Sequence, residues 1–113
     1  MSDCIFCKIA RKEIPGKIVY EDDEIIAFHD LDPKAPVHVL IIPKEHIPSM
    51  DDVTDDHIGL IGRLMVKVGE IAGQLGLENG YRLVNNCGED GMQTVKHLHF
   101  HLLGKRKMLW PPG

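Results

Sequence analysis

Short apolar runs rich in β-branched residues alternate with polar turns in the first part of the chain and predict strands. Two such runs, at 18–20 and 25–28, are separated by four acidic residues, Glu21 to Glu24, which predicts a β-hairpin. A third run, at 37–42, ends at Pro43. It follows a loop at 30–36 whose two prolines restrict the backbone.

A single long helix is predicted over 54–75. Thr54 is the expected N-cap, and Gly76 is the residue expected to end the helix. A shorter, mildly amphipathic helix is expected at 3–11. Apolar residues of the long helix recur at three- and four-residue spacing, so we interpret it as a cover for a sheet. They are Ile58, Ile61, Leu64, Met65, Val68, Ile71, Ala72 and Leu75.

Two further strands are predicted at 81–85 and 94–103, with a glycine-containing loop at 86–93 between them. Five strands with short connections and one long helix predict an α+β fold, in which the helix covers one face of a five-stranded antiparallel sheet. Because 113 residues are the usual length of one domain, we expect a single domain over 1–113.

Composition and charge exclude several classes of protein. Hydrophobic residues make up 43% and charged residues 27%, as in soluble globular chains, and no apolar run approaches the roughly 20 residues of a membrane helix. The formal net charge of −4 argues against broad nucleic-acid binding. The N-terminus shows no secretory pattern, and three cysteines without one favour a reducing compartment, so we expect a cytoplasmic protein.

Three of the seven histidines, His97, His99 and His101, alternate with apolar residues. In a strand their imidazoles therefore share one face. Two interpretations compete. Histidines at i and i+2 can hold one zinc or copper ion. Alternatively, a neutral imidazole attacks phosphorus while its neighbours hold protons and oxygens. Same-face positions lie about 6.5–7 Å apart, which is long for three ligands of one ion and favours phosphate chemistry for at least two of them.

The loop before these histidines supports phosphate chemistry. Residues 86–94 offer flexible glycines, backbone N–H groups and the side chains of Asn86, Gln93 and Thr94. Such groups can bind an oxyanion without a full positive charge.

A second group of residues has the chemistry of a metal site. Cys4 and Cys7 form a C-x-x-C pair whose spacing lets two thiolates bind one zinc ion. His46, after the third predicted strand, and His97 are candidates for the other two ligands. The alternative from spacing alone is two buried thiols and two surface histidines. Cys87 has no obvious partner and fits a small core residue better than a ligand.

The segment from Gln93 to Gly104 resembles the signature of the histidine triad family, H-φ-H-φ-H-φ-φ with φ apolar. The segments Phe28-His29-Asp30, Pro33-x-Ala35-Pro36-x-His38, Ile42-Pro43-Lys44-x-His46 and Trp110-Pro111-Pro112-Gly113 resemble the branch of histidine triad nucleotide-binding proteins, which hydrolyse nucleoside phosphoramidates. The resemblance covers nearly the whole chain.

This resemblance implies a homodimer whose two sheets join into a continuous ten-stranded sheet, and a purine nucleotide site. It implies cleavage of a nucleoside 5′-phosphoramidate or a related conjugate, with release of a nucleoside monophosphate. His99 would be the nucleophile that forms a nucleotidyl-histidine, His101 would assist proton transfer, and His38 would orient the triad. Nucleotide-binding residues would be Phe6, Ile9, Ile14, Phe28, His29, Asp30, Leu31, Asn86, Met92, Thr94 and Trp110, the last from the partner subunit.

The sequence departs from the family pattern in two places. Gly91-Met92 stands where Gly-Gly is frequent, so a phosphate contact there would rest on the Met92 backbone N–H. Lys105 stands where a glycine is frequent after the triad. Many bacterial members carry an N-terminal cysteine pair for structural zinc. That pattern implies Cys4, Cys7, His46 and His97 as zinc ligands, with no metal required for the chemistry.

Three alternatives to a phosphoramidate hydrolase stay open at this point. The chain could be a nucleotide-sensing scaffold with incidental catalysis, a dinucleoside polyphosphate hydrolase, or a metal-dependent hydrolase that uses the triad as ligands. The Trp-Pro-Pro-Gly end of the chain favours the phosphoramidate branch over the polyphosphate branch.

Overall fold

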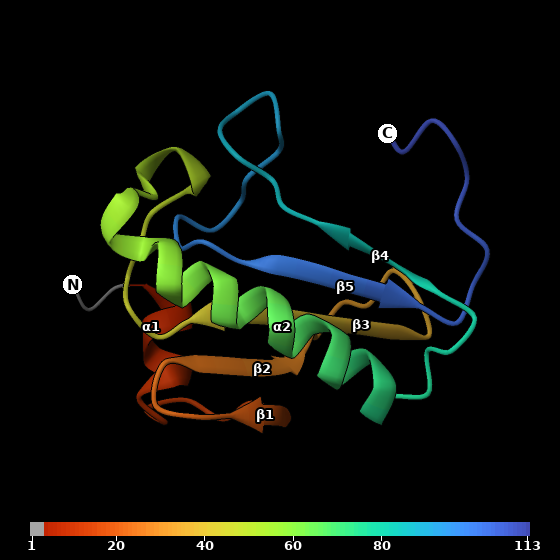
Figure 1. Cartoon of the computed structure of the whole chain (residues 1–113), viewed down its shortest axis with the longest axis horizontal. Coiled ribbons are helices and arrows are strands. Elements are labelled where there is room, and N and C mark those ends of the chain that lie inside the picture. The colour runs from red at the N-terminus through yellow and green to blue at the C-terminus, as the bar shows by residue number, and fades with distance from the viewer. Residues whose placement is uncertain (1–3) are drawn as a thin grey trace.

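The computed structural model describes residues 4–113 and contains one antiparallel sheet with strand order β1-β2-β3-β5-β4 (Figure 1). The predicted α+β fold with one long helix is therefore confirmed. The elements are α1 (Ile5–Ala10), β1 (Ile18–Glu21), β2 (Ile25–His29), β3 (Val37–Pro43), the 3₁₀ turns η1 (Met50–Asp52) and η2 (Asp55–His57), α2 (Ile58–Gln74), β4 (Tyr81–Val84) and β5 (Phe100–Gly104).

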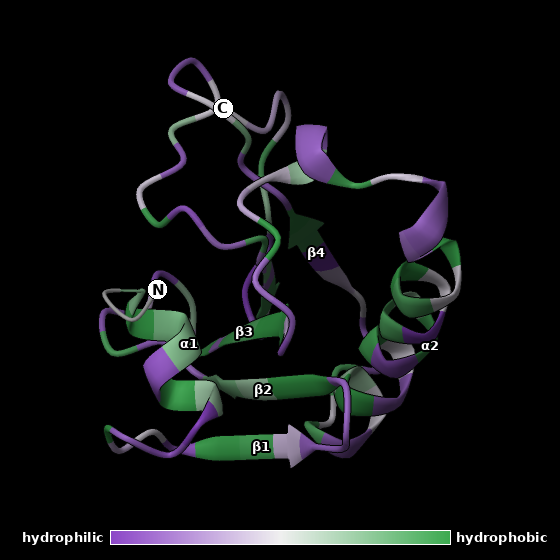
Figure 2. Ribbon diagram, turned by 90° about the vertical axis from the view of Figure 1, so that its left-hand side faces the viewer, coloured by the Kyte–Doolittle hydropathy of each residue, from purple (hydrophilic) through white to green (hydrophobic). Residues whose placement is uncertain are grey.

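The sheet lies between the two helices, with α1 on one face and α2 on the other (Figure 2). Each face buries its own apolar cluster. The α2 side buries Ile25, Val39, Ile41, Leu64 and Ile71 among others. The smaller cluster on the α1 side consists of Phe6, Ile9, Ile26, Phe28, Leu40 and Ile42. The strands therefore present apolar side chains on both faces, as a sheet covered on both sides requires.

The long helix begins later than predicted. Residues 55–57 form a 3₁₀ turn, and the Thr54 hydroxyl caps that turn by accepting the Asp56 N–H at 3.3 Å. The apolar stripe also differs, because Leu60 is buried whereas Ile58 and Met65 are 67% and 38% exposed. The residues that face the sheet are Leu60, Leu64, Val68, Ile71 and Ala72. The prediction that the helix covers a sheet holds with this corrected stripe.

Strand β5 begins at Phe100 and not at Thr94. Phe100 pairs with Ile41, so the same register would set Leu98 against Pro43. Proline has no N–H to donate, and β3 ends there. The N–H of Leu98 donates instead to the carbonyl of Ile47 at 2.6 Å. His97 and His99 therefore precede the strand.

The expected alternation of the histidines nevertheless persists. Leu98, Phe100 and Leu102 are buried in the cluster under α2. The rings of His97 and His99 both contact Phe6 of α1, on the opposite face. Within residues 4–113, no helix has the length and apolar character needed to cross a membrane. Residue 3, where the short helix was predicted to begin, lies outside the described residues.

Candidate functional site

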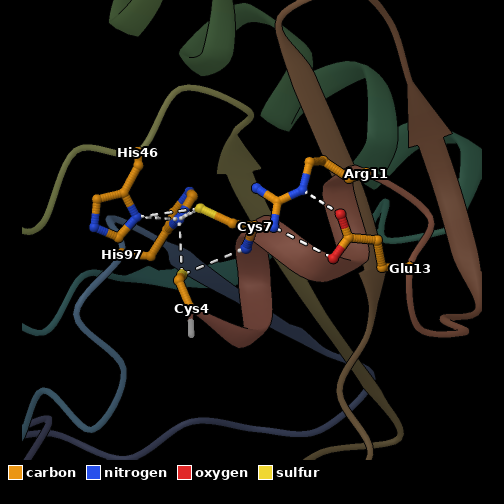
Figure 3. Close-up of polar contacts among 6 residues, drawn as sticks. All are labelled: Cys4, Cys7, Arg11, Glu13, His46 and His97. Atoms are coloured by element: carbon orange, nitrogen blue, oxygen red, sulfur yellow. Dashed lines mark hydrogen bonds and ion pairs between the residues drawn. The ribbon is translucent and has the colours of Figure 1, made fainter. Parts of the chain in front are cut away.

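His97 is anchored through both nitrogens of its ring. It is fully buried, and its Nε2 lies 2.8 Å from the carbonyl oxygen of Pro43. A carbonyl only accepts, so Nε2 carries the proton and Nδ1 carries a free lone pair. That Nδ1 points at three further ligand atoms, as Figure 3 shows.

Helix α1 supplies two of these atoms. Cys4 is its N-cap residue, and Cys7 lies one turn further on, with the backbone N–H of Cys7 directed at Sγ of Cys4 at 3.4 Å. Sγ of Cys4 and Sγ of Cys7 lie 3.4 Å and 3.5 Å from Nδ1 of His97. His46, in the loop after β3, places its Nδ1 3.3 Å from Sγ of Cys7 and 3.2 Å from Nδ1 of His97.

These distances fit a tetrahedral zinc ion. Bonds of about 2.3 Å to sulfur and 2.0–2.1 Å to nitrogen give tetrahedral edges of about 3.5 Å between sulfur and nitrogen and about 3.3 Å between two nitrogens. The four ligand atoms all lie within 4.8 Å of one another, and the three sulfur–nitrogen distances and the nitrogen–nitrogen distance above match these edges. Cys4, Cys7, His46 and His97 thus form a possible zinc site. A zinc ion bound there would act as a structural cross-link between α1 and two loops.

The electrostatics of this cluster call for a cation. Burial raises the pKa of the Cys7 thiol, and the neighbouring Cys4 raises it further. A thiolate pair at this position therefore needs a positive charge to stabilise it. Burial lowers the pKa of His97, which favours the neutral imidazole that a metal requires.

His99 shows the reverse arrangement of its two ring nitrogens. Its Nδ1 lies 2.6 Å from the backbone carbonyl oxygen of His97 and therefore carries the proton. The lone pair is then on Nε2, which has no hydrogen-bond partner among residues 4–113. Every buried side-chain nitrogen and oxygen in that range has a partner, so Nε2 must reach the surface although the residue is only 3% exposed.

His38 and His101 form a directed pair. The backbone N–H of Lys34 donates to Nδ1 of His38 at 3.0 Å, so the His38 proton is on Nε2. That Nε2 donates to Nδ1 of His101 at 2.9 Å, which places the His101 proton on its own Nε2. The rings of His99 and His101 lie 5.1 Å apart. His99 therefore offers a lone pair on Nε2, and the neighbouring His101 offers an N–H donor.

Both members of this pair are neutral at pH 7. Burial, together with the nearby His99 and His38, lowers the pKa of His101 to about 4. Burial also lowers the pKa of His38, against the opposing effect of Asp30. The directed hydrogen bonds require these neutral rings, because a doubly protonated His38 could not accept the Lys34 N–H.

Asp30, His38 and His101 also lie close enough to hold an ion. Their hydrogen bonds oppose this use. In His38 one nitrogen accepts from Lys34 and the other carries a proton, so neither lone pair is free for a metal. Asp30 accepts the backbone N–H of Asp32 at 2.7 Å, and its second oxygen lies 3.4 Å from Nε2 of His38. We therefore interpret Asp30, His38 and His101 as a hydrogen-bonded group and not as a metal site.

The structure brings together only part of the expected nucleotide site. Phe6, Ile9 and Phe28 are buried in one cluster beside the histidines, with Ile14 packed against it. Five other expected residues are exposed and outside this cluster: His29, Leu31, Met92, Thr94 and Trp110. The backbone N–H of Met92, the expected phosphate contact, donates to the carbonyl of Glu89 at 3.0 Å in a tight turn.

The loop beside the histidines depends on two residues. Nδ2 of Asn86 donates to the carbonyl of Gly91 at 2.7 Å. A Cβ atom on Gly91 would lie 2.3 Å from the backbone oxygen of Cys87, so only glycine fits this turn. The expected site residue Asn86 is thus held by the loop whose backbone N–H groups were predicted to bind an oxyanion.

Three groups that orient the site were not identified from the sequence. They are the backbone N–H of Lys34, the carbonyl of Pro43 and the amide of Asn85, whose Nδ2 donates to the backbone carbonyl of His99 at 2.9 Å. The first two are main-chain groups with no residue-type signal. Asn85 is the last residue of a predicted strand and Asn86 the first residue after it, and nothing in the sequence separates their roles.

A cavity of about 850 Å³ lies elsewhere, between the loop from α2 to β4 and residues 105–108. None of the expected site residues lines it. The candidate site is therefore defined by the orientation of the histidines and not by the depth of a cavity.

A five-stranded antiparallel sheet that carries a Cys₂His₂ cluster beside an oriented histidine pair defines a class of small α+β proteins. The model of the HIT domain matches residues 11–108, and the chain belongs to this histidine triad family. A HIT family hydrolase from Legionella pneumophila has 51% sequence identity and a TM-score of 0.96, with 98% of this chain and 100% of that chain covered. The protein therefore has the fold of a HIT family hydrolase.

Two further relatives are informative. A 14 kDa zinc-binding protein from Zea mays is 48% identical, with 99% of this chain and 89% of that protein covered. The structure of a histidine triad nucleotide-binding protein from Candida albicans has 33% identity and a TM-score of 0.85, with 98% of this chain and 85% of that chain covered. The zinc-binding relative agrees with the ligand geometry of the Cys₂His₂ cluster.

Proposed function

We propose that the protein hydrolyses purine nucleoside 5′-phosphoramidates, or related nucleoside monophosphate conjugates, through a nucleotidyl intermediate on His99. The observation that carries this proposal is the orientation of the His99 ring. Its Nδ1 donates to the carbonyl of His97 at 2.6 Å, which leaves the nucleophilic lone pair on Nε2, the ring nitrogen that has no hydrogen-bond partner among residues 4–113. An imidazole presented in this way is ready to attack phosphorus.

In the first step, Nε2 of His99 forms a bond to the α-phosphorus and the P–N bond to the leaving amine breaks. The imidazole then gains positive charge, which the carbonyl of His97 stabilises through Nδ1–H. Nε2–H of His101 is the donor placed to assist the leaving nitrogen, with His38 holding the ring. The amine leaves with the electron pair of the broken bond and takes up one proton.

In the second step, water attacks the phosphorus and breaks the N–P bond to His99. The nucleoside monophosphate leaves, and His99 returns to its neutral form. The water gives up one proton, which balances the proton that the amine took up. Neutral His38 and His101 suit this cycle at pH 7, since neither must lose a proton before substrate binds.

Nucleotide recognition would use groups on both sides of His99 and His101. The apolar cluster of Phe6, Ile9 and Phe28 is a surface against which a purine base can pack. Asp30, whose side chain is 21% exposed, is the carboxylate available to the ribose hydroxyls. Asn86 and Thr94 lie on the loop side, where the α-phosphate would be held.

We also propose that two copies associate through β4. This strand is at the edge of the sheet, and an open edge can pair with a second copy to give ten continuous strands. Tyr81 on β4 is 45% exposed, and Trp110 is 82% exposed. Arg82 donates to the carbonyl of Leu109 at 2.9 Å and so holds the terminal segment beside β4. Trp110 could then reach the site of the partner.

Sedimentation equilibrium should give twice the chain mass, and a monomer would refute this arrangement.

The proposed activity is tested with a fluorogenic adenosine phosphoramidate. His99→Ala should lower kcat/KM by roughly 10²-fold or more, because the nucleophile is lost. His57→Asn is the matched control, since His57 lies in the 3₁₀ turn before α2 and should leave the rate unchanged. Equal rates for wild type and His99→Ala would exclude His99 as the nucleophile. Tight binding of AMP without turnover would favour a nucleotide-sensing role.

A further inference from the structure

The possible zinc site and the proposed nucleophile both contact one aromatic ring, that of Phe6. Phe6 lies between Cys4 and Cys7 in α1 and is 7% exposed. Its ring centroid is 5.0 Å from that of His99, with planes at 83°, and 6.0 Å from that of His97, with planes at 72°. Such edge-to-face contacts have a preferred geometry, so they fix the rings relative to one another.

The position of α1 depends on the two cysteines. The helix has only six residues, too few for stability on its own. In the described part of the chain, the polar contacts of residues 4–10 with the chain beyond residue 13 all run through Sγ of Cys4 and Sγ of Cys7. The remaining anchors of α1 are apolar side chains, chiefly Phe6 and Ile9. Metal ligation by the cysteines would therefore restrict the position of the Phe6 ring, in addition to its packing against Phe28 at 5.6 Å between ring centroids.

The backbone of His97, in contrast, is held independently of the metal. The N–H of Leu98 donates to the carbonyl of Ile47 at 2.6 Å, and Nε2 of His97 is bound to Pro43. The carbonyl that accepts Nδ1–H of His99 thus has a fixed location. The side of His99 that faces α1 has no such anchor except the Phe6 ring.

We propose that Phe6 is a positioning residue that couples the Cys₂His₂ cluster to the nucleophile, so that zinc and nucleotide each strengthen the binding of the other. Zinc holds α1, α1 holds Phe6, and Phe6 restricts the His99 ring to the orientation that a nucleotide contacts. This inference rests on the proposed function, since it takes a nucleoside monophosphate as the ligand of the His99 face. Coupling of this kind is reciprocal in binding free energy.

The test measures zinc affinity by competition with a chelator, without AMP and with saturating AMP. In wild type, AMP should raise zinc affinity by about 5-fold or more, the lower end of common coupling factors. Phe6→Leu should still bind zinc through the unchanged ligands, but its affinity ratio should fall to one. Phe6→Tyr, which keeps the ring, should retain the ratio. Ile5→Val is the matched control on the same helix, because Ile5 is 47% exposed and belongs neither to the zinc ligands nor to the proposed base site, so the affinity ratio should stay at the wild-type value.

A second readout needs no nucleotide. The Nδ1–H proton of His99 should exchange slowly with solvent in the zinc-loaded wild type and faster in zinc-loaded Phe6→Leu. Equal exchange in the two proteins, or an equal affinity ratio, would overturn the role of Phe6. A wild-type protein that fails to bind AMP at all, while the exchange rates differ as expected, would refute the proposed function and leave the link between Phe6 and His99 standing.

Discussion

Nε2 of His38 lies 2.9 Å from Nδ1 of His101, although 63 residues separate them in the chain. The contact crosses between two paired strands, because His38 lies on β3 and His101 on β5. It is directional, since the Lys34 N–H occupies the other nitrogen of His38. The His38 ring and the Lys34 backbone thus determine which nitrogen of His101 carries its proton.

Replacing His38 by alanine should therefore impair catalysis without affecting the zinc site. His101 would lose the donor that fixes its tautomer, and loss of such an orienting partner costs about 10- to 100-fold in activity in comparable sites. The measurement is kcat/KM with a phosphoramidate substrate, together with zinc content. A rate within twofold of wild type would show that His38 does not orient His101.

The lowered pKa of His101 predicts a pH-dependent stability. Its pKa is about 4 in the folded protein and 6.5 ordinarily, so between these pH values the unfolded chain binds a proton that the folded chain does not. The free energy of unfolding should be constant with respect to this group above pH 6.5. It should decrease as pH falls toward 4, by at most about 1.4 kcal/mol per pH unit.

Because acid also releases zinc, the pH effect is isolated by comparison with His101→Gln. Glutamine can still accept a hydrogen bond from His38 but does not titrate. Urea unfolding of both proteins between pH 7 and 5 should give a steeper decrease for wild type. Parallel curves would mean that His101 ionises in the folded protein as it does in the unfolded chain.

Cys4→Ser should reduce zinc content and lower the melting temperature, because a tetrahedral site with three good ligands binds zinc much more weakly. Cys87→Ser is the matched control. Cys87 is also partly exposed and unbonded to another cysteine in the described chain, but it lies in the loop after β4. Metal analysis and thermal melts of the two variants check this prediction. Full zinc stoichiometry in Cys4→Ser would refute the ligand set.

Gly91→Ala should disturb the loop that holds Asn86. The new Cβ would meet the backbone oxygen and nitrogen of Cys87 at 2.3 Å and 2.8 Å, so the main chain must shift. Displacement of a substrate-positioning group by about 1 Å can cost up to 100-fold in rate. We expect kcat/KM to fall by about 10- to 100-fold with zinc content unchanged.

The control for this variant is Gly69→Ala. A Cβ there meets nothing within 4 Å, and the residue lies in the interior of α2. Alanine should stabilise the helix by about 0.5–1 kcal/mol and leave the rate unchanged. A Gly91→Ala protein as active as this control would show that the loop does not position the phosphate.

Patterns in the sequence predicted the elements of the fold and the candidate residues of the site. Alternation of histidine and apolar residues predicted one shared face, and C-x-x-C spacing predicted a metal pair, because both patterns depend on local backbone geometry. The boundaries of β5 and of the stripe on α2 were wrong. They depend on where β3 ends, at Pro43, and on which side of the helix meets the sheet.

The different hydrogen-bond partners of the three histidines are evident only in the folded chain. His97 is directed toward the cysteines by the Pro43 carbonyl, His99 is oriented by the His97 carbonyl, and His101 is oriented by His38. These partners are main-chain atoms or residues distant in the chain, so no residue pattern encodes them. The position of a proton on an imidazole depends on which acceptor or donor lies next to it, and that is settled only when the strands and loops come together.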